Sequence, residues 1–293
     1  MKILFIGSDT ADYQNDVLLH GFKQKFGDLV IDVPQKSCMY DGLPDPEPIY
    51  GNGFTIFKTL KLDNVNRSDI KPKIQDRFFD LIVYGSVRRN LSYIYDVIPL
   101  YNKNQIVFID GEDDTSIYGH ALKYGLYFKR ELDSYIDGVY PTSFGFPEEK
   151  IPKNFCKKTK QISNIIPDFN QNYTFNVESE YYKEYQQSMF AWTWKKAGWD
   201  CMRHYEILFN RCLPLFFELN KLPNKTMVDF PRSQIESYQN RFFEKTSGVY
   251  KDSMRILDRI DENEYNDVVD SVFNYCKDNL TTKRCVEKIL NYL

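Results

Sequence analysis

One stretch, residues 188–218, constrains the fold most, because it has the order of a strand, a turn, a helix and a second strand. Residues 188–194 are apolar and aromatic with no helix breaker, which favours a buried strand. Over residues 201–212 the apolar side chains recur every three or four positions, as in a helix with one buried face. Residues 213–217 form a second apolar run with Pro214 near its start. The stretch therefore predicts a parallel βαβ crossover.

The turn between this strand and this helix holds the most suggestive polar residues. It contains the only glycine of the unit, Gly198, and Asp200 is placed to cap the helix, whose amino terminus would attract phosphate. A cation at Arg203 and an imidazole at His204 could meet a diphosphate, and Glu206 could accept hydrogen bonds from ribose hydroxyls. On pattern alone, a surface ion pair of Arg203 with Glu206 beside a solvated His204 is the simpler interpretation.

Residues 198–216, GWDCMRHYEILFNRCLPLF, resemble the carboxyl-terminal nucleotide-sugar site of GT-B glycosyltransferases. In those families a glycine-containing turn leads into a helix whose glutamate holds the donor ribose, and a small residue followed by proline opens the next strand. Glu206 stands at the glutamate position, and residues 212–214 stand at the start of the strand. The sequence departs from the common pattern where glycine is expected before the strand, since it has Asn210, Arg211 and Cys212 there.

The resemblance also extends along the chain. Residues 1–235 are similar to a group of short, poorly characterised glycosyltransferase-like proteins through ADYQND, FDLIVYGS, FIDGEDD, YFKREL and GWDCMRHYEI, in this order. It implies an α/β fold of two Rossmann-like domains facing a cleft (GT-B-like), with a helical C-terminal tail. It implies a hexosyl- or pentosyltransferase that moves a sugar from a nucleotide-diphosphate sugar, expected to be a UDP-sugar, to a hydroxyl of a glycan or of a modified base in phage or viral DNA. Such a reaction requires no resident cofactor.

The amino-terminal half starts with the pattern of a Rossmann-like domain. Residues 2–8 predict a strand, residues 15–26 a helix, and residues 29–33 a second strand, without the G-x-G-x-x-G of a dinucleotide site. Residues 34–73 are irregular, and further elements are predicted as strands over 80–84, 105–109, 126–129 and 161–166, and as helices over 91–101, 116–124 and 178–187.

The charged run EEKIPK, residues 148–153, marks a domain boundary. We expect an N-terminal Rossmann-like acceptor domain over residues 1–150 and a C-terminal nucleotide-sugar-binding domain over residues 151–293, the latter almost wholly helical from residue 233 onward. Ligands of such folds bind at the carboxyl ends of the strands.

A general base must take the proton of the acceptor hydroxyl, and the turn after the first strand offers Asp9, Asp12 and Asp16. GT-B enzymes often carry their base in this turn or in another loop of the amino domain. The resemblance therefore makes Asp12 the first choice. The alternative is that Asp12 only caps the following helix.

A second candidate is the acidic cluster of residues 110–114, which directly follows a predicted strand. Its four acids repel one another and need cations or solvent to offset them. Three interpretations are open. Asp113 is a candidate general base, or the cluster as a whole is a candidate Mg²⁺ or Mn²⁺ site. In the third interpretation the cluster is only a solvated turn whose side chains cap the backbone. A strand followed by D-x-x-D also resembles the metal motif of GT-A glycosyltransferases. Lys129, Arg130 and Glu131 are expected to face these acids.

Other side chains complete the predicted site. Lys195, or its neighbour Lys196, is a candidate ligand of the diphosphate, and Trp199 could pack on a base or a sugar. The acceptor side of the cleft is assigned to the following residues: Tyr13, Gly85, Ser86, Asp110 and Arg130. No residue is assigned to a metal, although a divalent metal at the acidic cluster remains an alternative. A rival from another class is a non-catalytic binding protein on a GT-B scaffold.

Net charge, cysteine spacing and apolar runs limit the binding partners and the cellular compartment that we expect for this protein. A net charge of −3 provides no general attraction to nucleic acid, so DNA binding would need a local basic patch. The six cysteines show no metal-binding spacing, and MKILFIGSD has no signal-peptide pattern, so we expect reduced thiols in a cytoplasmic protein, or one of the host cytoplasm if it is viral. No apolar run approaches the length of a membrane span.

Overall fold

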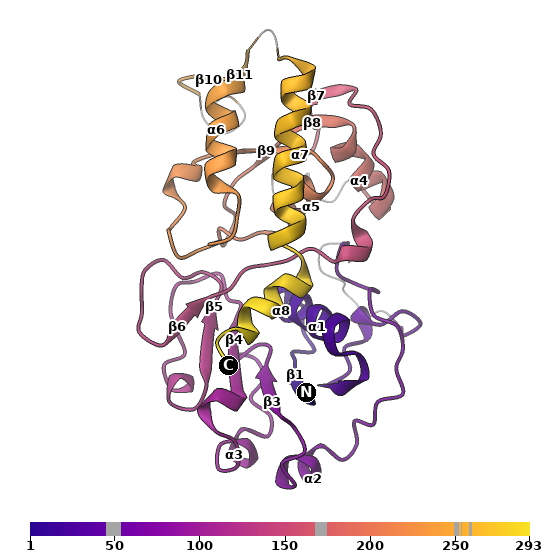
Figure 1. Cartoon of the computed structure of the whole chain (residues 1–293), viewed down its shortest axis with the longest axis vertical. Helices are drawn as coiled ribbons and strands as arrows, with labels where there is room; N and C mark the ends of the chain where they lie inside the picture. The colour runs from indigo at the N-terminus through magenta and orange to yellow at the C-terminus, as the bar shows by residue number, and fades with distance from the viewer. Residues whose placement is uncertain (45–53, 168–174, 249–251, 253, 258–259) are drawn as a thin grey trace.

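The structure, a computed structural model, describes residues 1–44, 54–167, 175–248, 252, 254–257 and 260–293. Two α/β halves follow one another along its long axis, and the chain returns at its end to the half in which it began (Figure 1). Each half contains a parallel sheet, so the predicted α/β class with two Rossmann-like units is confirmed. No helix of the described segments is both long and apolar enough to cross a membrane.

The sheet of the first half has six parallel strands in the order β2-β1-β3-β4-β5-β6. Its strands are β1 (Ile3–Ile6), β2 (Val30–Val33), β3 (Leu81–Tyr84), β4 (Ile106–Asp110), β5 (Leu126–Lys129) and β6 (Val139–Pro141). The chain crosses from β1 to β2 on one side and then to β3 on the other, so the strand order reverses between β1 and β3. Ligands of doubly wound folds bind at such a reversal, at the carboxyl ends of the strands.

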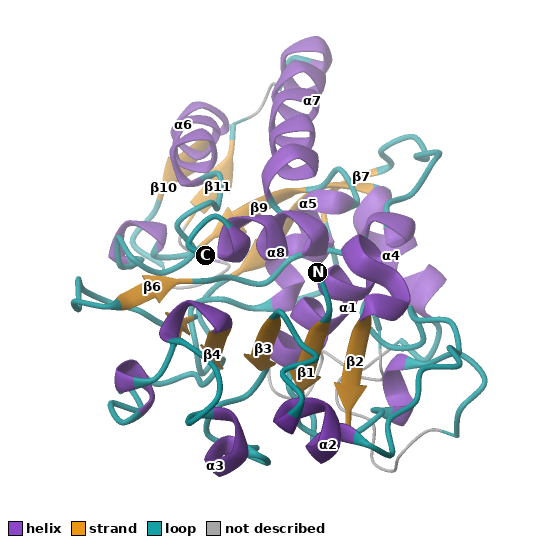
Figure 2. Ribbon diagram, turned by 60° about the horizontal axis from the view of Figure 1, so that its bottom comes forward, coloured by secondary structure: helices purple, strands orange, loops and turns teal. Residues whose placement is uncertain are grey.

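Helices cover both faces of this sheet (Figure 2). Alternate side chains of β1 enter two separate cores, because successive residues of a strand point to opposite faces. Ile3 and Phe5 join the core that contains α1 (Tyr13–Phe26), while Leu4 and Ile6 join the core of α2 (Ile70–Gln75) and α3 (Ile94–Val97). Strands buried on both faces explain the continuous apolar runs in the sequence.

The second half is built on three parallel strands, β7 (Lys160–Ile162), β8 (Ser188–Thr193) and β9 (Leu213–Phe216). Helix α5 (Met202–Phe209) connects β8 to β9, which confirms the predicted βαβ crossover. The remaining helices of this half are α4 (Glu178–Gln186), α6 (Arg232–Phe242) and α7 (Glu262–Asn279). Single turns of 3₁₀ helix occur at Gly27–Leu29, Ser37–Met39, Lys103–Gln105, Ala121–Lys123, Glu148–Lys150 and Leu219–Lys221.

The last helix, α8 (Thr282–Leu290), packs against α1 of the first half (Figures 1 and 2). The two helices approach closely because Gly21 has no side chain: a Cβ there would lie 2.3 Å from the carbonyl oxygen of Thr282. His20 reinforces the contact, since its Nδ1 lies 2.8 Å from Oγ1 of Thr282. The carboxyl terminus thus fastens the second half to the first.

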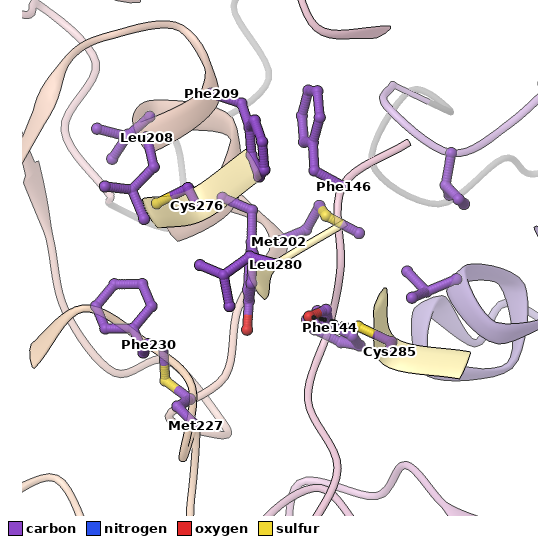
Figure 3. Close-up of a cluster of buried hydrophobic side chains, with 14 of the residues drawn as sticks. Phe144, Phe146, Met202, Leu208, Phe209, Met227, Phe230, Cys276, Leu280 and Cys285 are labelled. Carbon is purple, nitrogen blue, oxygen red and sulfur yellow. Dashed lines mark hydrogen bonds between the residues drawn. The ribbon is translucent and has the colours of Figure 1, made fainter. Parts of the chain in front are cut away.

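A shared apolar core joins the halves (Figure 3). Phe144 and Phe146 come from the segment after β6; Phe146 lies beside Phe209 of α5, and Phe144 lies beside Cys285 of α8. The ring of Phe146 stacks on that of Phe209 with centroids 4.6 Å apart, and Leu280 is fully buried beside them. Burial of these apolar side chains stabilises the contact between the two halves.

Several predicted elements differ from the observed ones. The first helix begins at Tyr13 rather than at residue 15, because Asp12 caps it and accepts the N–H of Asn15 at 3.1 Å. Residues 91–101 contain only the short helix Ile94–Val97, and residues 116–124 only a 3₁₀ turn.

The tail is also less helical than predicted, because an antiparallel hairpin interrupts it. Its strands are β10 (Phe243–Lys245) and β11 (Met254–Ile256). Phe243 anchors the hairpin, since its ring lies edge-on to Phe190 at 4.8 Å while Glu244 and Lys245 remain exposed. The strand is short and lacks a period of two in its burial, and the helical periodicity of the flanking segments concealed it.

Candidate active site at the junction of the two halves

The carboxyl ends of β4 and β5 meet the turn that follows β8. Arg130, just after β5, donates from Nη1 to the carbonyl oxygen of Asp200 at 2.6 Å. The carboxylate of Glu131 accepts the backbone N–H groups of Trp199 and Asp200, each at 2.9 Å. The predicted donor turn of the second half and the predicted acceptor-side loops of the first half are therefore in direct contact.

Arg130 is the hub of this contact and is 2% exposed. Its guanidinium donates to the carbonyl of Gly111 at 3.0 and 2.9 Å, to the carboxylate of Asp113, and to Glu131 at 2.7 Å. It also lies over the ring of Phe144, 4.7 Å from the centroid. Burial opposes the charge, but the surrounding carboxylates outweigh it and raise the pKa of Arg130.

The acids of residues 110–114 each have a partner, and Lys129 and Arg130 face them as predicted. Asp110 is buried and accepts from Lys129 at 3.0 Å, from Nε of Arg88 at 2.9 Å and from the hydroxyl of Tyr127 at 2.5 Å. The other pairs are Glu112 with Arg89, Asp113 with Arg130, and Asp114 with Ser116. Within the described segments, no three His, Cys, Asp or Glu side chains are grouped so as to hold a metal ion.

Asp12 lies beside this network at the strand reversal. Its Oδ2 is 3.6 Å from Nη1 of Arg89, and a Cβ on Gly111 would stand 3.3 Å from its Oδ1. The same carboxylate caps α1, so the capping interpretation is confirmed, and the catalytic interpretation remains a prediction. Sequence reasoning missed Arg89 as the cation facing Asp12.

The remaining acceptor-side residues have different environments. Tyr13 stacks on Phe57 with centroids 6.0 Å apart and meets Phe144 edge-on at 6.3 Å. Gly85 and Ser86 are enclosed, and a Cβ on Gly85 would stand 2.4 Å from Oδ1 of Asn15. The lack of a side chain at Gly85 lets the end of β3 pack closely against α1, and the assignment of Gly85 and Ser86 to the acceptor side of the cleft stays a prediction.

Asp200 does not cap α5, which corrects the predicted cap. The N-cap residue is Cys201, and no side chain bonds the first turn from that position. The carboxylate of Asp200 instead accepts the N–H of Phe144 and the hydroxyl of Tyr205, both at 2.8 Å. Burial raises the pKa of Asp200 to about 7; Arg130 opposes this rise and Glu131 adds to it.

His204 is fully enclosed rather than solvated. Its Nδ1 lies 2.7 Å from Oγ1 of Thr193, and its Nε2 lies 2.8 Å from the carbonyl oxygen of Trp199. Burial, followed by the charge of Arg203, lowers the pKa of His204 to about 3. A neutral, fully bonded imidazole cannot serve as a phosphate cation, so this assignment is corrected: His204 positions the turn from behind.

Arg203 and Glu206 form no surface pair, because both are buried and have other partners. Arg203 donates from Nε to Oγ1 of Thr193 at 3.2 Å and from Nη2 to the carbonyl oxygen of Trp194 at 3.1 Å. Glu206 faces the junction, and its pKa is raised by burial.

Both oxygens of the Glu206 carboxylate accept hydroxyl groups. Oε1 accepts Oγ1 of Thr55 at 2.5 Å, and Oε2 accepts the hydroxyl of Tyr181 at 2.6 Å. Sequence reasoning missed both partners. Thr55 lies 151 positions from Glu206, and no local pattern signals such a contact.

The outer part of the turn is open to solvent. Lys195 is exposed, and its Nζ lies 5.6 Å from the ring centroid of Trp199. Trp199 is half-buried and stacks parallel to Phe216 at 6.4 Å. A groove of about 740 Å³ between α6 and α7, and a pocket of about 400 Å³ beside β9, lie elsewhere in the second half and include none of the predicted site residues.

Comparison with known proteins gave structural likenesses only. No protein-family model matches the sequence, and no curated protein matches it. Among solved structures, the chain is similar to an alpha-glucosyltransferase in complex with UDP-glucose and DNA containing an abasic site, with a TM-score of 0.47 and 8% identity. It is also similar to an alpha-glucosyltransferase bound to UDP and a 13-mer DNA containing a HMU base (TM-score 0.45, 9% identity) and to one in complex with UDP (0.46, 10%). Each likeness covers 99% of this chain and 98% of the other.

Proposed function

We propose that the protein is a glycosyltransferase that moves a sugar from a nucleotide-diphosphate sugar to an acceptor hydroxyl. One observation carries the proposal: the turn before α5 presents the N–H groups of Trp199 and Asp200 to an anionic carboxylate, and Glu206, one turn deeper, binds hydroxyl groups. Successive backbone N–H groups of a turn can also bind phosphate, and a carboxylate accepts hydrogen bonds from hydroxyl groups such as those of ribose. These contacts support the assignment of the turn to the diphosphate and of Glu206 to the ribose.

In this proposal residues 151–293 bind the donor and residues 1–150 bind the acceptor. Gly198 is essential to the donor turn, because a Cβ there would stand 2.6 Å from Glu131 and 2.7 Å from Asp113. The exposed Lys195 and the half-buried Trp199 supply a cation and a flat ring at the outer side of the same turn. We place the reaction in the cytoplasm, in keeping with six cysteines that are all free thiols.

The proposed reaction forms a bond between the acceptor oxygen and the anomeric carbon, and it breaks the bond from that carbon to the diphosphate. The leaving diphosphate keeps the electron pair, and the N–H groups of the turn together with Lys195 stabilise its charge. Asp12 takes the proton of the acceptor hydroxyl. Asp113, which is exposed and paired with Arg130, is the second choice for this role. A hydroxyl of a glycan and a hydroxyl of a modified DNA base are the two acceptor classes to be compared.

A thermal-shift panel tests the proposal. UDP, GDP, ADP, CMP and their sugars are added with and without Mn²⁺, and the expected result is a rise in Tm with one nucleotide that needs no metal and is lost in Glu206→Ala. A rise that requires Mn²⁺ and is lost in Asp113→Ala would move the donor site to the acidic cluster. If no nucleotide changes Tm in the wild type or in any variant described below, the non-catalytic scaffold replaces the proposal.

A further inference from the structure

Glu131 occupies the position where a donor diphosphate would bind. Its two oxygens accept the N–H groups of Trp199 and Asp200, the last two residues before the N-cap of α5. The same carboxylate pairs with Arg130 at 2.7 Å, so it also uses the nearest buried cation. Glu131 itself is 2% exposed and belongs to the first half. An anion from one half is thus held by the anion-binding groups of the other.

Thr55 occupies the position where a donor ribose would bind. It also belongs to the first half, and its hydroxyl lies 2.5 Å from Oε1 of Glu206. Its N–H donates to Glu178 at 2.5 Å, and its hydroxyl lies 2.7 Å from that of Tyr182, so the residue is inserted between α4 and α5. Tyr181, the second partner of Glu206, belongs to the same half as Glu206, so this hydrogen bond does not link the two halves.

The backbone conformation of Thr55 indicates that a ligand could displace this residue from Glu206. Its φ is +73°, in the left-handed region that β-branched residues rarely adopt. Backbone conformations of this kind cost free energy and persist only where the surrounding contacts hold them. A residue held in this way leaves its position more readily than an unstrained one once a ligand offers Glu206 a replacement hydroxyl.

The two occupied positions lie along one continuous surface. Phe57, two residues after Thr55, stacks on Tyr13, and Tyr13 contacts Phe144. Phe144 in turn lies under the guanidinium of Arg130, next to Glu131, and contacts the ring of Tyr205, next to Glu206. A single displacement of the first half along this surface would withdraw both groups.

We propose that the first half occupies the donor site of the second, with Glu131 in place of the diphosphate and Thr55 in place of a ribose hydroxyl. The inference rests on the proposed function and adds to it a built-in competitor for the donor. Because the donor must displace both groups, its apparent dissociation constant equals the intrinsic one divided by the fraction of protein in which both contacts are open. Donor binding and separation of the two contacts are therefore one coupled event.

Glu131→Gln and Thr55→Val test the proposal, since each removes one competing group with little change of shape. The binding of UDP, or of the nucleoside diphosphate that the panel identifies, and of inorganic pyrophosphate is measured by titration calorimetry. Glu131→Gln is expected to tighten both ligands about three- to tenfold, the equivalent of one hydrogen bond. Thr55→Val is expected to tighten both ligands by a similar factor, because the two contacts open together and loss of either one raises the fraction of open protein.

Two matched variants serve as controls. Thr226→Val also removes a buried hydroxyl that bonds across the junction, to the carbonyl oxygen of Leu132 at 2.8 Å, but away from the donor groups. Glu184→Gln also removes a buried carboxylate that accepts a backbone N–H, that of Asn164 at 2.8 Å. Both are expected to bind either ligand as the wild type does.

The outcomes separate the inference from the proposed function. If the wild type binds the nucleotide and both test variants bind it equally or more weakly, Glu131 and Thr55 are structural contacts and the inference is wrong, while the proposed function stands. If neither the wild type nor any variant binds a nucleotide, the proposed function fails. Should Glu131→Gln not fold, Thr55→Val decides the inference by the same comparison. Equal tightening in Thr226→Val would show general loosening of the junction and would overturn the inference.

Discussion

Arg130 donates a hydrogen bond to the carbonyl oxygen of Asp200 at 2.6 Å, although 70 positions separate the two residues. The contact brings the end of β5, with Arg130 and Glu131, to the turn before α5. Its surroundings are dry, because Arg130 and Asp200 are each 2% exposed. Electrostatic interactions in such a place are stronger than at the surface. The four predictions below probe this junction and the elements that hold it.

Gly198→Ala should open the junction. The added methyl carbon would stand 2.6 Å from Oε1 of Glu131 and 2.7 Å from Oδ1 of Asp113, so either these two side chains or the turn itself must shift. We expect a loss of about 1–3 kcal/mol in the free energy of unfolding, measured by urea denaturation. Gly119→Ala is the control, since a Cβ on Gly119 meets nothing within 4 Å. Equal stability of the two variants would contradict the described position of the turn.

Asp12→Asn should separate capping from catalysis. Asparagine caps helices about as well as aspartate, so α1 should keep its stability, whereas a general base is lost. We expect an unchanged Tm and a fall in kcat of about 10²–10⁴-fold in a sugar-transfer assay. Asp12→Ala should show the same fall in kcat together with a loss of about 1 kcal/mol of stability. Full activity in Asp12→Asn would move the base to another residue, with Asp113 the next to be tested.

Asp200→Asn should change how stability depends on pH. Burial raises the pKa of Asp200 from 3.8 to about 7, so between these values the folded protein holds a proton that the unfolded chain releases. This group therefore favours folding most at low pH, and its contribution, roughly 4 kcal/mol at most, is lost as pH rises through 7. The free energy of unfolding of the wild type minus that of Asp200→Asn should fall over this range.

His204 provides a reason for measuring that difference rather than the wild type alone. Its pKa is lowered from 6.5 to about 3, so between these pH values the unfolded chain holds a proton that the folded protein does not. The contribution of His204 to the free energy of unfolding therefore rises with pH over this range. The two groups oppose each other in the wild type, and the subtraction cancels the histidine. A difference that is flat between pH 4 and pH 7 would show that Asp200 titrates normally.

Gly21→Ala should detach the last helix from the first. A Cβ at this position would lie 2.3 Å from the carbonyl oxygen and 2.8 Å from the carbonyl carbon of Thr282, and backbone cannot yield as a flexible side chain does. We expect a loss of more than about 2 kcal/mol in the free energy of unfolding. Faster amide hydrogen exchange in α8 should accompany it, while exchange in α6 remains as in the wild type. Equal exchange in both helices would contradict the described packing of α8 on α1.

What the sequence by itself determined was local. The period of apolar residues predicted the β8–α5–β9 crossover, and the opening strand and helix predicted a Rossmann-like start. The cap at Asp12 could also be predicted, because it lies directly before the helix. The pairing of Arg130 with the acids after β4 could be predicted because adjacent parallel strands bring their carboxyl ends together. These features depend on spacing within one element or on neighbouring strands.

Only the tertiary structure decided which polar groups meet at the junction. His204 and Arg203 look like solvated residues in the sequence, and they are buried because Thr193 and the carbonyl groups of the turn satisfy them. Thr55 reaches Glu206 over 151 positions, and His20 reaches Thr282 over 262. No local period encodes such pairs. They arise because burial of the apolar core of both halves places distant polar groups side by side. A buried polar group without a partner costs free energy, so these groups form hydrogen bonds with one another.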